Sequence, residues 1–212
     1  NAEGKGPAWG NSLFEDNAEY GYGMYLGVKQ IREKLAHLME QELNADKEQV
    51  VGDGKVTADY AKVAGGSIST NNNAVHQVNK GVMPTEDTKQ RTGELKQAFR
   101  EWLNSRDDGN ASRIAADKII KILANNNYNN YKDIDIDKNI LEEIADKKGY
   151  LVKPSVWIVG GDGWAYDIGF GGVDHVLASG EDVNLFIMDT EVYSNTGGQS
   201  SKSTPAAAVA KF

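Results

Sequence analysis

Ser155-Val-Trp-Ile-Val-Gly160, followed at once by Gly161-Asp-Gly163, is the stretch that decides the fold. A second apolar run, Val183-Asn-Leu-Phe-Ile-Met-Asp189, comes about twenty residues later. Continuous apolar runs of this length, separated by a helix-length segment, predict two parallel strands buried on both faces in a βαβ unit. The connecting segment, about 166–179, has the apolar residues of a helix. Its three glycines indicate close packing or approach of the backbone to a ligand.

The rest of the chain shows the pattern of helices and loops. Apolar residues recur at steps of three and four, as on one face of a helix. The predicted helices span 22–43, 86–106, 112–124 with Ser112 as N-cap, and 137–148, with a weaker one near 58–64. We therefore expect an α/β fold, with a mostly parallel sheet flanked by helices. Within it we place a helical insertion at 22–148 and a Gly-Asp-Gly unit at 149–212.

Composition narrows the classes of function. The 212 residues include 23 Lys and Arg against 31 Asp and Glu, a net charge of −8, which argues against binding to nucleic acid. No apolar run approaches the roughly 18–20 residues that span a bilayer, and no signal peptide is visible. The absence of cysteine excludes disulfides, thiolate catalysis and Cys-held clusters within this stretch. The given sequence begins at Asn1 without a Met, and 205–212 resembles the start of a helix that is cut off. We therefore expect a fragment of a longer chain.

Two loops at the predicted strand ends carry the candidate chemistry. Asp162 lies between glycines that let the backbone approach a phosphate, and its carboxylate is a hard oxygen ligand suited to Mg²⁺. The loop Asp189-Thr-Glu-Val-Tyr-Ser-Asn195 follows the next strand. Ligands of open α/β sheets bind beyond the carboxyl ends of the strands, so both loops should meet at one site. The tripeptide alone leaves another interpretation open, a tight turn in which Asp162 caps a helix.

Other motifs have simpler interpretations. Gly52-Asp-Gly54 follows no long apolar strand and is typical of a surface turn. Asp133-Ile-Asp-Ile-Asp-Lys-Asn139 begins like an EF-hand loop, but Lys138 and Ile144 occupy its glycine and bidentate glutamate positions. A solvated acidic linker is therefore favoured there. His175 is interpreted as a packed or interface residue.

Three features stay open between a structural and a functional role. Trp164 and Tyr166 either pack over a cofactor or fill the core. Asn195, taken alone, is more typical of a turn residue than of a catalytic one. Gly197-Gly-Gln-Ser-Ser-Lys202 lacks the ending of a P-loop, so an ordered loop at a dimer or domain contact is favoured over a phosphate cradle.

Longer strings carry a resemblance to a known family. Gly161-Asp-Gly163 with Asn195 downstream resembles the thiamine-diphosphate signature. Gly160-Gly-Asp-Gly-Trp-Ala-Tyr-Asp-Ile-Gly169 and Met188-Asp-Thr-Glu-Val-Tyr-Ser-Asn-Thr-Gly-Gly-Gln199 resemble pyruvate:ferredoxin (flavodoxin) oxidoreductase. Gly6-Pro-Ala-Trp9 and the segment 11–21 are similar to the same family. The resemblance is close over about 4–30 and 149–212, and it implies that 1–212 is part of the thiamine-diphosphate-binding domain.

The resemblance also implies roles for individual residues. Asp162, the Thr190 side chain and the Val192 carbonyl would hold Mg²⁺. Asn195 would lie near the reacting centre as a catalytic residue. The residues that would bind the cofactor are Gly161, Asp162, Gly163, Trp164, Thr190, Glu191, Val192, Tyr193, Ser194 and Asn195.

The activity that the resemblance implies is oxidative decarboxylation of pyruvate to acetyl-coenzyme A and carbon dioxide. Electrons would pass through [4Fe-4S] clusters to ferredoxin or flavodoxin. The cluster cysteines and the acid that activates the cofactor would lie outside this chain, so we expect the fragment to be inactive alone. The implied protein is a homodimer located in the cytoplasm or in a hydrogenosome-type organelle. It would bind neither nucleic acid nor membranes. The alternatives are a non-enzymatic diphosphate or nucleotide-binding module, a relative acting on another 2-oxo acid, and one passing electrons to a nicotinamide.

Overall fold

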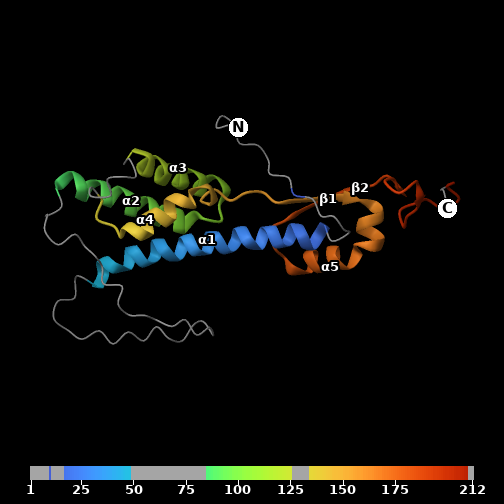
Figure 1. Ribbon diagram of the computed structural model, residues 1–212, viewed down its shortest axis with the longest axis horizontal. Coiled ribbons are helices and arrows are strands. Elements are labelled where there is room, and N and C mark those ends of the chain that lie inside the picture. The colour runs from blue at the N-terminus through green and yellow to red at the C-terminus, as the bar shows by residue number, and fades with distance from the viewer. Residues whose placement is uncertain (1–9, 11–16, 49–84, 126–133, 210–212) are drawn as a thin grey trace. The chain divides into compact units, whose positions relative to one another are not determined.

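The computed structural model describes residues 10, 17–48, 85–125 and 134–209. The chain divides into two compact units: unit 1 comprises Asn1–Gln30 with Pro154–Phe212, and unit 2 comprises Ile31–Lys153. Figure 1 labels the elements of both units. The predicted insertion at 22–148 stays a prediction, as does the 149–212 unit. The second Gly-Asp-Gly and the weak helix near 58–64 lie outside the described residues.

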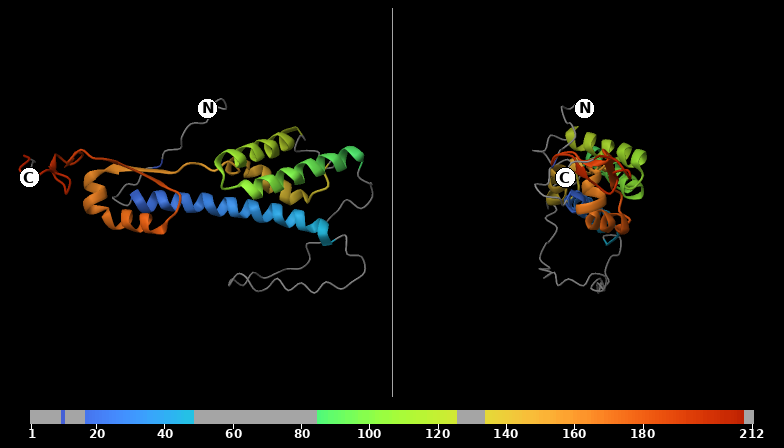
Figure 2. Two further views of the ribbon diagram at one scale, coloured as in Figure 1. Left: turned by 180° about the vertical axis from the view of Figure 1, so that it is seen from behind. Right: turned by 90° about the vertical axis from the view of Figure 1, so that its right-hand side faces the viewer.

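Unit 2 is built from helices. It contains the later part of α1 (Asn17–Glu48), which confirms the helix predicted at 22–43 and extends it at both ends. The other elements are α2 (Glu86–Ser105), α3 (Gly109–Asn125), α4 (Lys138–Asp146) and the short 3₁₀ helix η2 (Lys148–Tyr150). Figure 2 shows α2, α3 and α4 from two further directions. The amphipathic spacing therefore identified all four helices.

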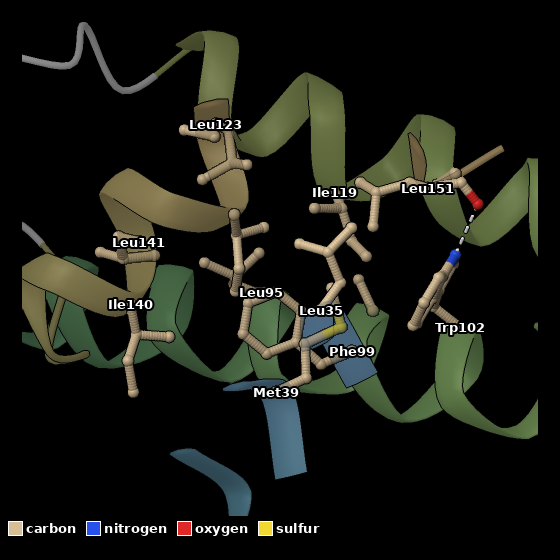
Figure 3. Packing of buried hydrophobic residues seen from close by; sticks show 14 of the residues in the cluster. Leu35, Met39, Leu95, Phe99, Trp102, Ile119, Leu123, Ile140, Leu141 and Leu151 are labelled. Atoms are coloured by element: carbon tan, nitrogen blue, oxygen red, sulfur yellow. Dashed lines mark hydrogen bonds between the residues drawn. The ribbon is translucent and has the colours of Figure 1, made fainter. Parts of the chain in front are cut away.

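Apolar side chains from each helix meet in the core of unit 2. Leu35 and Met39 of α1, Phe99 of α2 and Ile119 of α3 are fully buried in one cluster. Figure 3 shows them converging with leucines and isoleucines of α3 and α4. Burial of such side chains stabilises a domain by about 1.5–3 kcal/mol each. Trp102 can be buried in this apolar core because its polar indole N–H donates to the Leu151 carbonyl at 2.9 Å.

Arg32 is a buried cation at the edge of this core, only 7% exposed. Its guanidinium donates to the carbonyls of Tyr150 and Leu151 at 2.7 Å and of Arg106 at 2.6 Å. It also lies 5.2 Å from the ring centroid of Trp102. Burial lowers the pKa of Arg32, an effect opposed by nearby Asp107. Arg32 thus satisfies carbonyls at the ends of α2 and η2 that their helices leave without partners.

The helix starts are capped by side chains, and one prediction about them is wrong. Asp108 Oδ1 accepts the backbone N–H groups of Asn110 and Ala111 at 3.1 Å, so α3 begins at Gly109. Ser112, predicted as the N-cap, lies within the helix and is buried. Asp137 caps α4 in the same way, with Oδ1 accepting from Asn139 N at 2.8 Å. The acidic run therefore contains a helix cap.

Unit 1 contains the predicted βαβ arrangement. Strands β1 (Trp157–Gly161) and β2 (Asn184–Met188) pair in parallel, from Trp157 opposite Asn184 to Gly161 opposite Met188. The π-helix η3 (Trp164–Ile168) and helix α5 (Phe170–Ser179) connect them. A short antiparallel pair, β3 (Val192–Tyr193) with β4 (Gln199–Ser200), follows. The expected α/β fold class is confirmed.

The two faces of the parallel pair differ. Ile158 packs with Val173 and Val176 of α5, and Leu185 and Ile187 border the same cluster. The other face presents exposed apolar side chains: Trp157, Val159, Phe186 and Met188. The prediction that both faces are buried is thus wrong for the described residues, because the helices of unit 1 pack against only one of them.

The end of the described chain also differs from expectation. Residues 205–209 form no helix, and Ala207 has a φ of 70° in the left-handed region. A non-glycine residue in that region interrupts a right-handed helix. The helix start predicted at 205–212 is therefore wrong over its described part. None of the helices in the described ranges has the length and apolar character needed to cross a membrane.

Candidate functional site

Asp162 is the centre of the candidate site. It follows β1 directly, in the turn that leads into η3, and its side chain is fully buried. A buried ionised carboxylate is costly unless hydrogen bonds satisfy its oxygens. The structure supplies these bonds from two separate segments, the loop after β2 and the loop after β4. The Asp162 turn after β1 therefore contacts the loop after β2, as predicted, whereas its contact with the loop after β4 was not predicted.

Each oxygen of Asp162 has its own partners. Oδ1 accepts from the backbone N–H of Thr190 at 3.1 Å and from its hydroxyl at 3.0 Å. Oδ2 accepts from the hydroxyls of Ser201 at 2.5 Å and Ser203 at 2.7 Å. Burial alone raises the pKa of Asp162, but these hydrogen bonds outweigh it and lower the pKa to about 2. Asp162 is therefore an anion at neutral pH.

The three predicted metal ligands lie together. The Thr190 hydroxyl oxygen is 3.0 Å from Asp162 Oδ1 and 3.1 Å from the Val192 carbonyl oxygen. The single hydroxyl proton can serve only one of these two acceptors at a time. One carboxylate, one hydroxyl and one carbonyl are hard oxygen donors of the kind that Mg²⁺ takes from proteins. Among the described residues, no group of three or more His, Cys, Asp or Glu side chains could hold a metal ion. This mixed set of oxygen donors is therefore the candidate metal site.

The backbone at Glu191 is bent to produce this arrangement. Glu191 has a φ of 61°, a left-handed conformation that is uncommon for residues other than glycine. Its N–H donates to Asp189 Oδ1 at 3.2 Å, which closes the turn after β2. Such strained residues persist where the surrounding structure holds them, and they cluster at functional sites. The side chain of Glu191 is exposed, so a direct contact with the cofactor stays a prediction.

The two glycines of the Gly161-Asp-Gly163 motif have different surroundings. A Cβ on Gly163 would lie 2.5 Å from the ring of Tyr193, so the absence of a side chain at Gly163 lets this ring pack against the backbone. A Cβ on Gly161 would meet nothing within 4 Å, so open space adjoins the backbone there. Trp164 is buried in the core of unit 1, and Gly160 and Gly169 give it room. Tyr166 borders the same core.

Asp167, in η3, binds both Tyr193 of the loop after β2 and Lys202 after β4. Its Oδ2 accepts from the hydroxyl of Tyr193 at 3.1 Å and from the backbone N–H of Lys202 at 3.2 Å. The Lys202 ammonium lies 3.6 Å from the other carboxylate oxygen and donates to the Tyr166 carbonyl at 2.9 Å. Lys202, the last residue of the segment 197–202, is thus held against η3 within unit 1. The predicted dimer or domain contact of this segment stays a prediction.

Not all predicted residues gather around Asp162. Ser194 and Asn195 are exposed in the turn between β3 and β4, which the Gly198 N–H closes on the Tyr193 carbonyl at 2.8 Å. The catalytic role of Asn195 stays a prediction. His175 is exposed on α5, with its ring edge-on to Tyr22 at 5.9 Å between centroids.

Sequence reasoning missed the residues that complete the site. Ser201 and Ser203 contact Asp162 directly, and Asp167 anchors Tyr193. The one available signal is a dense run of hydroxyl side chains, Ser200-Ser-Lys-Ser-Thr204. That run does not by itself tell which hydroxyls face inward.

The site belongs to an α/β unit in which oxygen atoms of Asp162, Thr190 and Val192 gather near the carboxyl ends of two parallel strands. Over its whole length, the chain is homologous to a segment of enzymes that oxidise pyruvate. It is 43% identical to pyruvate-flavodoxin oxidoreductase from Klebsiella pneumoniae and 41% identical to pyruvate:ferredoxin oxidoreductase from Moorella thermoacetica, in each case over 100% of this chain and 14% of the relative. It is also 43% identical to "Pyruvate dehydrogenase [NADP(+)]" from Cryptosporidium parvum, over 100% of this chain and 10% of that protein.

These similarities confirm the resemblance that the motifs indicated. The chain spans only about a tenth to a seventh of the length of these curated relatives. No family model matches the chain.

Proposed function

We propose that this chain is the segment of a pyruvate:ferredoxin (flavodoxin) oxidoreductase that binds the diphosphate and Mg²⁺ of thiamine diphosphate. The observation that carries the proposal is the cluster of three oxygens formed by Asp162 Oδ1, Thr190 Oγ1 and Val192 O. Asp162 and Thr190 follow the ends of two adjacent parallel strands, and Val192 begins β3 just beyond them. In open α/β sheets that edge is where ligands bind.

The chemistry of the donor set fits a diphosphate-bound Mg²⁺. Mg²⁺ usually takes one or two protein carboxylates and completes its coordination with waters and substrate phosphates. Asp162 supplies one negative charge, and Thr190 and Val192 supply neutral oxygens. The chain carries a net charge of −8, so a bound cation would offset repulsion between the protein and a diphosphate.

The open space beside Gly161 is the proposed position of the diphosphate. A Cβ there would meet nothing within 4 Å, unlike one at Gly163. The absence of a side chain lets a phosphate approach the backbone closely. Gly163, Trp164 and the loop 190–195 would complete the pocket.

The bound cofactor would supply a nucleophilic carbon for the 2-oxo group of pyruvate and would hold the electrons left when carbon dioxide departs. The residues of this chain would anchor and orient it, with Asn195 near the reacting centre. The complete protein would carry [4Fe-4S] clusters, pass electrons to ferredoxin or flavodoxin, transfer the acetyl group to coenzyme A, and act as a cytoplasmic or organellar homodimer.

A second electron acceptor has specific support. The names of the relatives from Cryptosporidium parvum and Euglena gracilis both contain "Pyruvate dehydrogenase [NADP(+)]", which supports NADP⁺ as an acceptor. The same cofactor segment serves either acceptor in this proposal, because acceptor choice would lie elsewhere in the complete protein. Assays of the complete protein with ferredoxin, flavodoxin and NADP⁺ would distinguish the acceptors.

Calorimetry on the full-length protein tests the proposal. Asp162→Ala should abolish Mg²⁺-dependent binding of thiamine diphosphate, because it removes the charged ligand. Gly161→Ala should weaken that binding while leaving the melting temperature unchanged, because its new methyl group would occupy only the open space. Asp174→Ala, which removes an exposed carboxylate on α5, is the matched control and should bind normally. Unchanged affinity in the Asp162 variant would refute the metal assignment.

A further inference from the structure

A tight turn of hydroxyl residues closes one side of the Asp162 site. We call residues 201–204 the hydroxyl turn. The Thr204 N–H donates to the Ser201 carbonyl at 3.1 Å, and the Ser201 N–H donates to the Thr204 hydroxyl at 2.9 Å. The backbone N–H of Lys202 is held by Asp167 at 3.2 Å. These bonds give the turn a defined conformation.

Two hydroxyls of this turn bind the same carboxylate oxygen. Ser201 and Ser203 both donate to Asp162 Oδ2, and their own oxygens lie 2.9 Å apart. Each serine has one hydroxyl proton, so when both donate to Asp162 neither donates to the other. Ser201 is 9% exposed, which limits competition from water. Together they occupy Oδ2 and leave Oδ1 on the side of Thr190.

The third hydroxyl reaches the other half of the site. Thr204 donates to the carbonyl of Glu191. Glu191 is the left-handed residue between Thr190 and Val192, the two neutral ligands proposed for Mg²⁺. The hydroxyl turn therefore holds the carboxylate with two of its side chains and the strained ligand loop with another.

We infer that Ser201, Ser203 and Thr204 are positioning residues for the metal, which hold Asp162 and Glu191 so that Asp162 Oδ1, Thr190 Oγ1 and Val192 O face one Mg²⁺. This inference rests on the proposed function. Groups that orient a metal ligand without touching the metal typically contribute about 10-fold to 100-fold in metal affinity. The loss of one of the three hydroxyls should therefore weaken Mg²⁺ binding without removing any ligand.

The test uses the full-length protein with saturating thiamine diphosphate, titrated with Mg²⁺ in a calorimeter. Ser203→Ala and Thr204→Val each remove one hydroxyl and should raise the Mg²⁺ dissociation constant about 10-fold. Ser203→Thr and Thr204→Ser keep the hydroxyl and should restore affinity to within about 3-fold of the wild type. Ser200→Ala removes an exposed hydroxyl next to the turn and serves as the control.

Activity supplies a second readout. The Mg²⁺ concentration for half-maximal activity should rise with the dissociation constant in Ser203→Ala and Thr204→Val. The kcat at saturating Mg²⁺ should stay within about 2-fold of the wild type, because the ligands themselves are intact. General structural damage would lower kcat at every Mg²⁺ concentration.

The outcomes separate this inference from the proposed function. If Asp162→Ala abolishes binding but both hydroxyl-deleted variants keep the wild-type Mg²⁺ affinity, the positioning role is wrong and the proposed function stands. If the affinity falls in the deleted variants and returns in Ser203→Thr and Thr204→Ser, the positioning role is supported. If Asp162→Ala binds normally, both are overturned. Should Ser203→Ala fail to fold, Thr204→Val tests the same role from the other end of the turn.

Discussion

Units 1 and 2 both have an apolar core, but they differ in the charged groups that they bury. In unit 2, four helices enclose an apolar cluster around Phe99 and Trp102, and one of its buried cations, Arg32, satisfies carbonyls at helix ends. In unit 1, a two-stranded parallel sheet ends at a buried carboxylate, Asp162, held by hydroxyls from two loops. Hydrocarbon burial stabilises unit 2 directly. Burial of an anion is unfavourable by itself, and the hydrogen bonds of unit 1 offset that cost.

The difference teaches where to look for function. A cluster such as that of unit 2 is sufficiently explained by stability, since apolar burial is favourable wherever it occurs. The arrangement around Asp162 is not, because an apolar turn of similar size would avoid the cost of burying a charge. The following four predictions test this contrast in order of expected effect.

Phe99→Ala should have the largest effect. Its ring is fully buried among side chains of unit 2, so truncation removes apolar contact and leaves a cavity. We expect the free energy of unfolding of the chain to fall by about 4 kcal/mol, as measured by urea denaturation followed by far-ultraviolet circular dichroism. Ile114→Ala, at a side chain that is 59% exposed, should change it by less than about 0.5 kcal/mol. Similar losses in both variants would contradict the assigned core.

Arg32→Met should come next. Methionine keeps much of the stem but removes the donors to the carbonyls of Tyr150, Leu151 and Arg106. The Leu151 carbonyl keeps the indole N–H of Trp102, but the carbonyls of Tyr150 and Arg106 lose this donor. A carbonyl left without a partner costs about 1–3 kcal/mol where water cannot reach it, so we expect a loss of about 3 kcal/mol in the same assay. Arg100→Met, at an exposed position of α2, is the control. An unchanged free energy of unfolding in Arg32→Met would show that water replaces the guanidinium.

Gly163→Ala should have a smaller effect, confined to unit 1. Its Cβ would lie 2.5 Å from the Tyr193 ring, so the ring must move and its hydrogen bond to Asp167 at 3.1 Å must weaken. Such overpacking costs about 1–3 kcal/mol, against little for Gly161→Ala, whose Cβ meets nothing within 4 Å. Thermal melts of the two variants measure the contrast. Equal destabilisation by both would contradict the packing of Tyr193 on the motif.

The smallest expected effect is a dependence of stability on pH, which sets in only in acid. Because the hydrogen bonds of folded Asp162 lower its pKa from 3.8 to about 2, the unfolded chain takes up this proton first as pH falls. The stability that ionised Asp162 contributes is therefore fully present above about pH 4 and is lost as pH falls through about 2. Asp162→Asn cannot show this loss. The difference in unfolding free energy between wild type and variant, measured from pH 5 to pH 2, should shrink with falling pH, and a constant difference would contradict the assigned pKa.

The sequence predicted much of the fold and part of the site. Steps of three and four residues identified α1 to α4, and the two apolar runs identified β1 and β2, because periodic burial leaves a local pattern. The Gly-Asp-Gly motif identified Asp162, and the family resemblance added Thr190 and Val192, which the structure brings together with Asp162. The wrong predictions concern features that depend on distant contacts, namely the buried second face of the sheet and the helix at 205. The cap predicted at Ser112 failed because the helix begins earlier. Asp108 accepts the N–H groups of Asn110 and Ala111, which places Ser112 inside α3.

Local chemistry thus determined which residues could act. The order of apolar and polar residues determined the helices, the parallel strands and the position of a carboxylate at a strand end, because these depend on neighbours along the chain. Only the tertiary structure decided which groups satisfy that carboxylate. Ser201 and Ser203 lie 39 and 41 positions from Asp162, and the loop geometry alone brings their hydroxyls to Oδ2. A run of serines offers many hydroxyls, and the three-dimensional path of the backbone selects the two that donate.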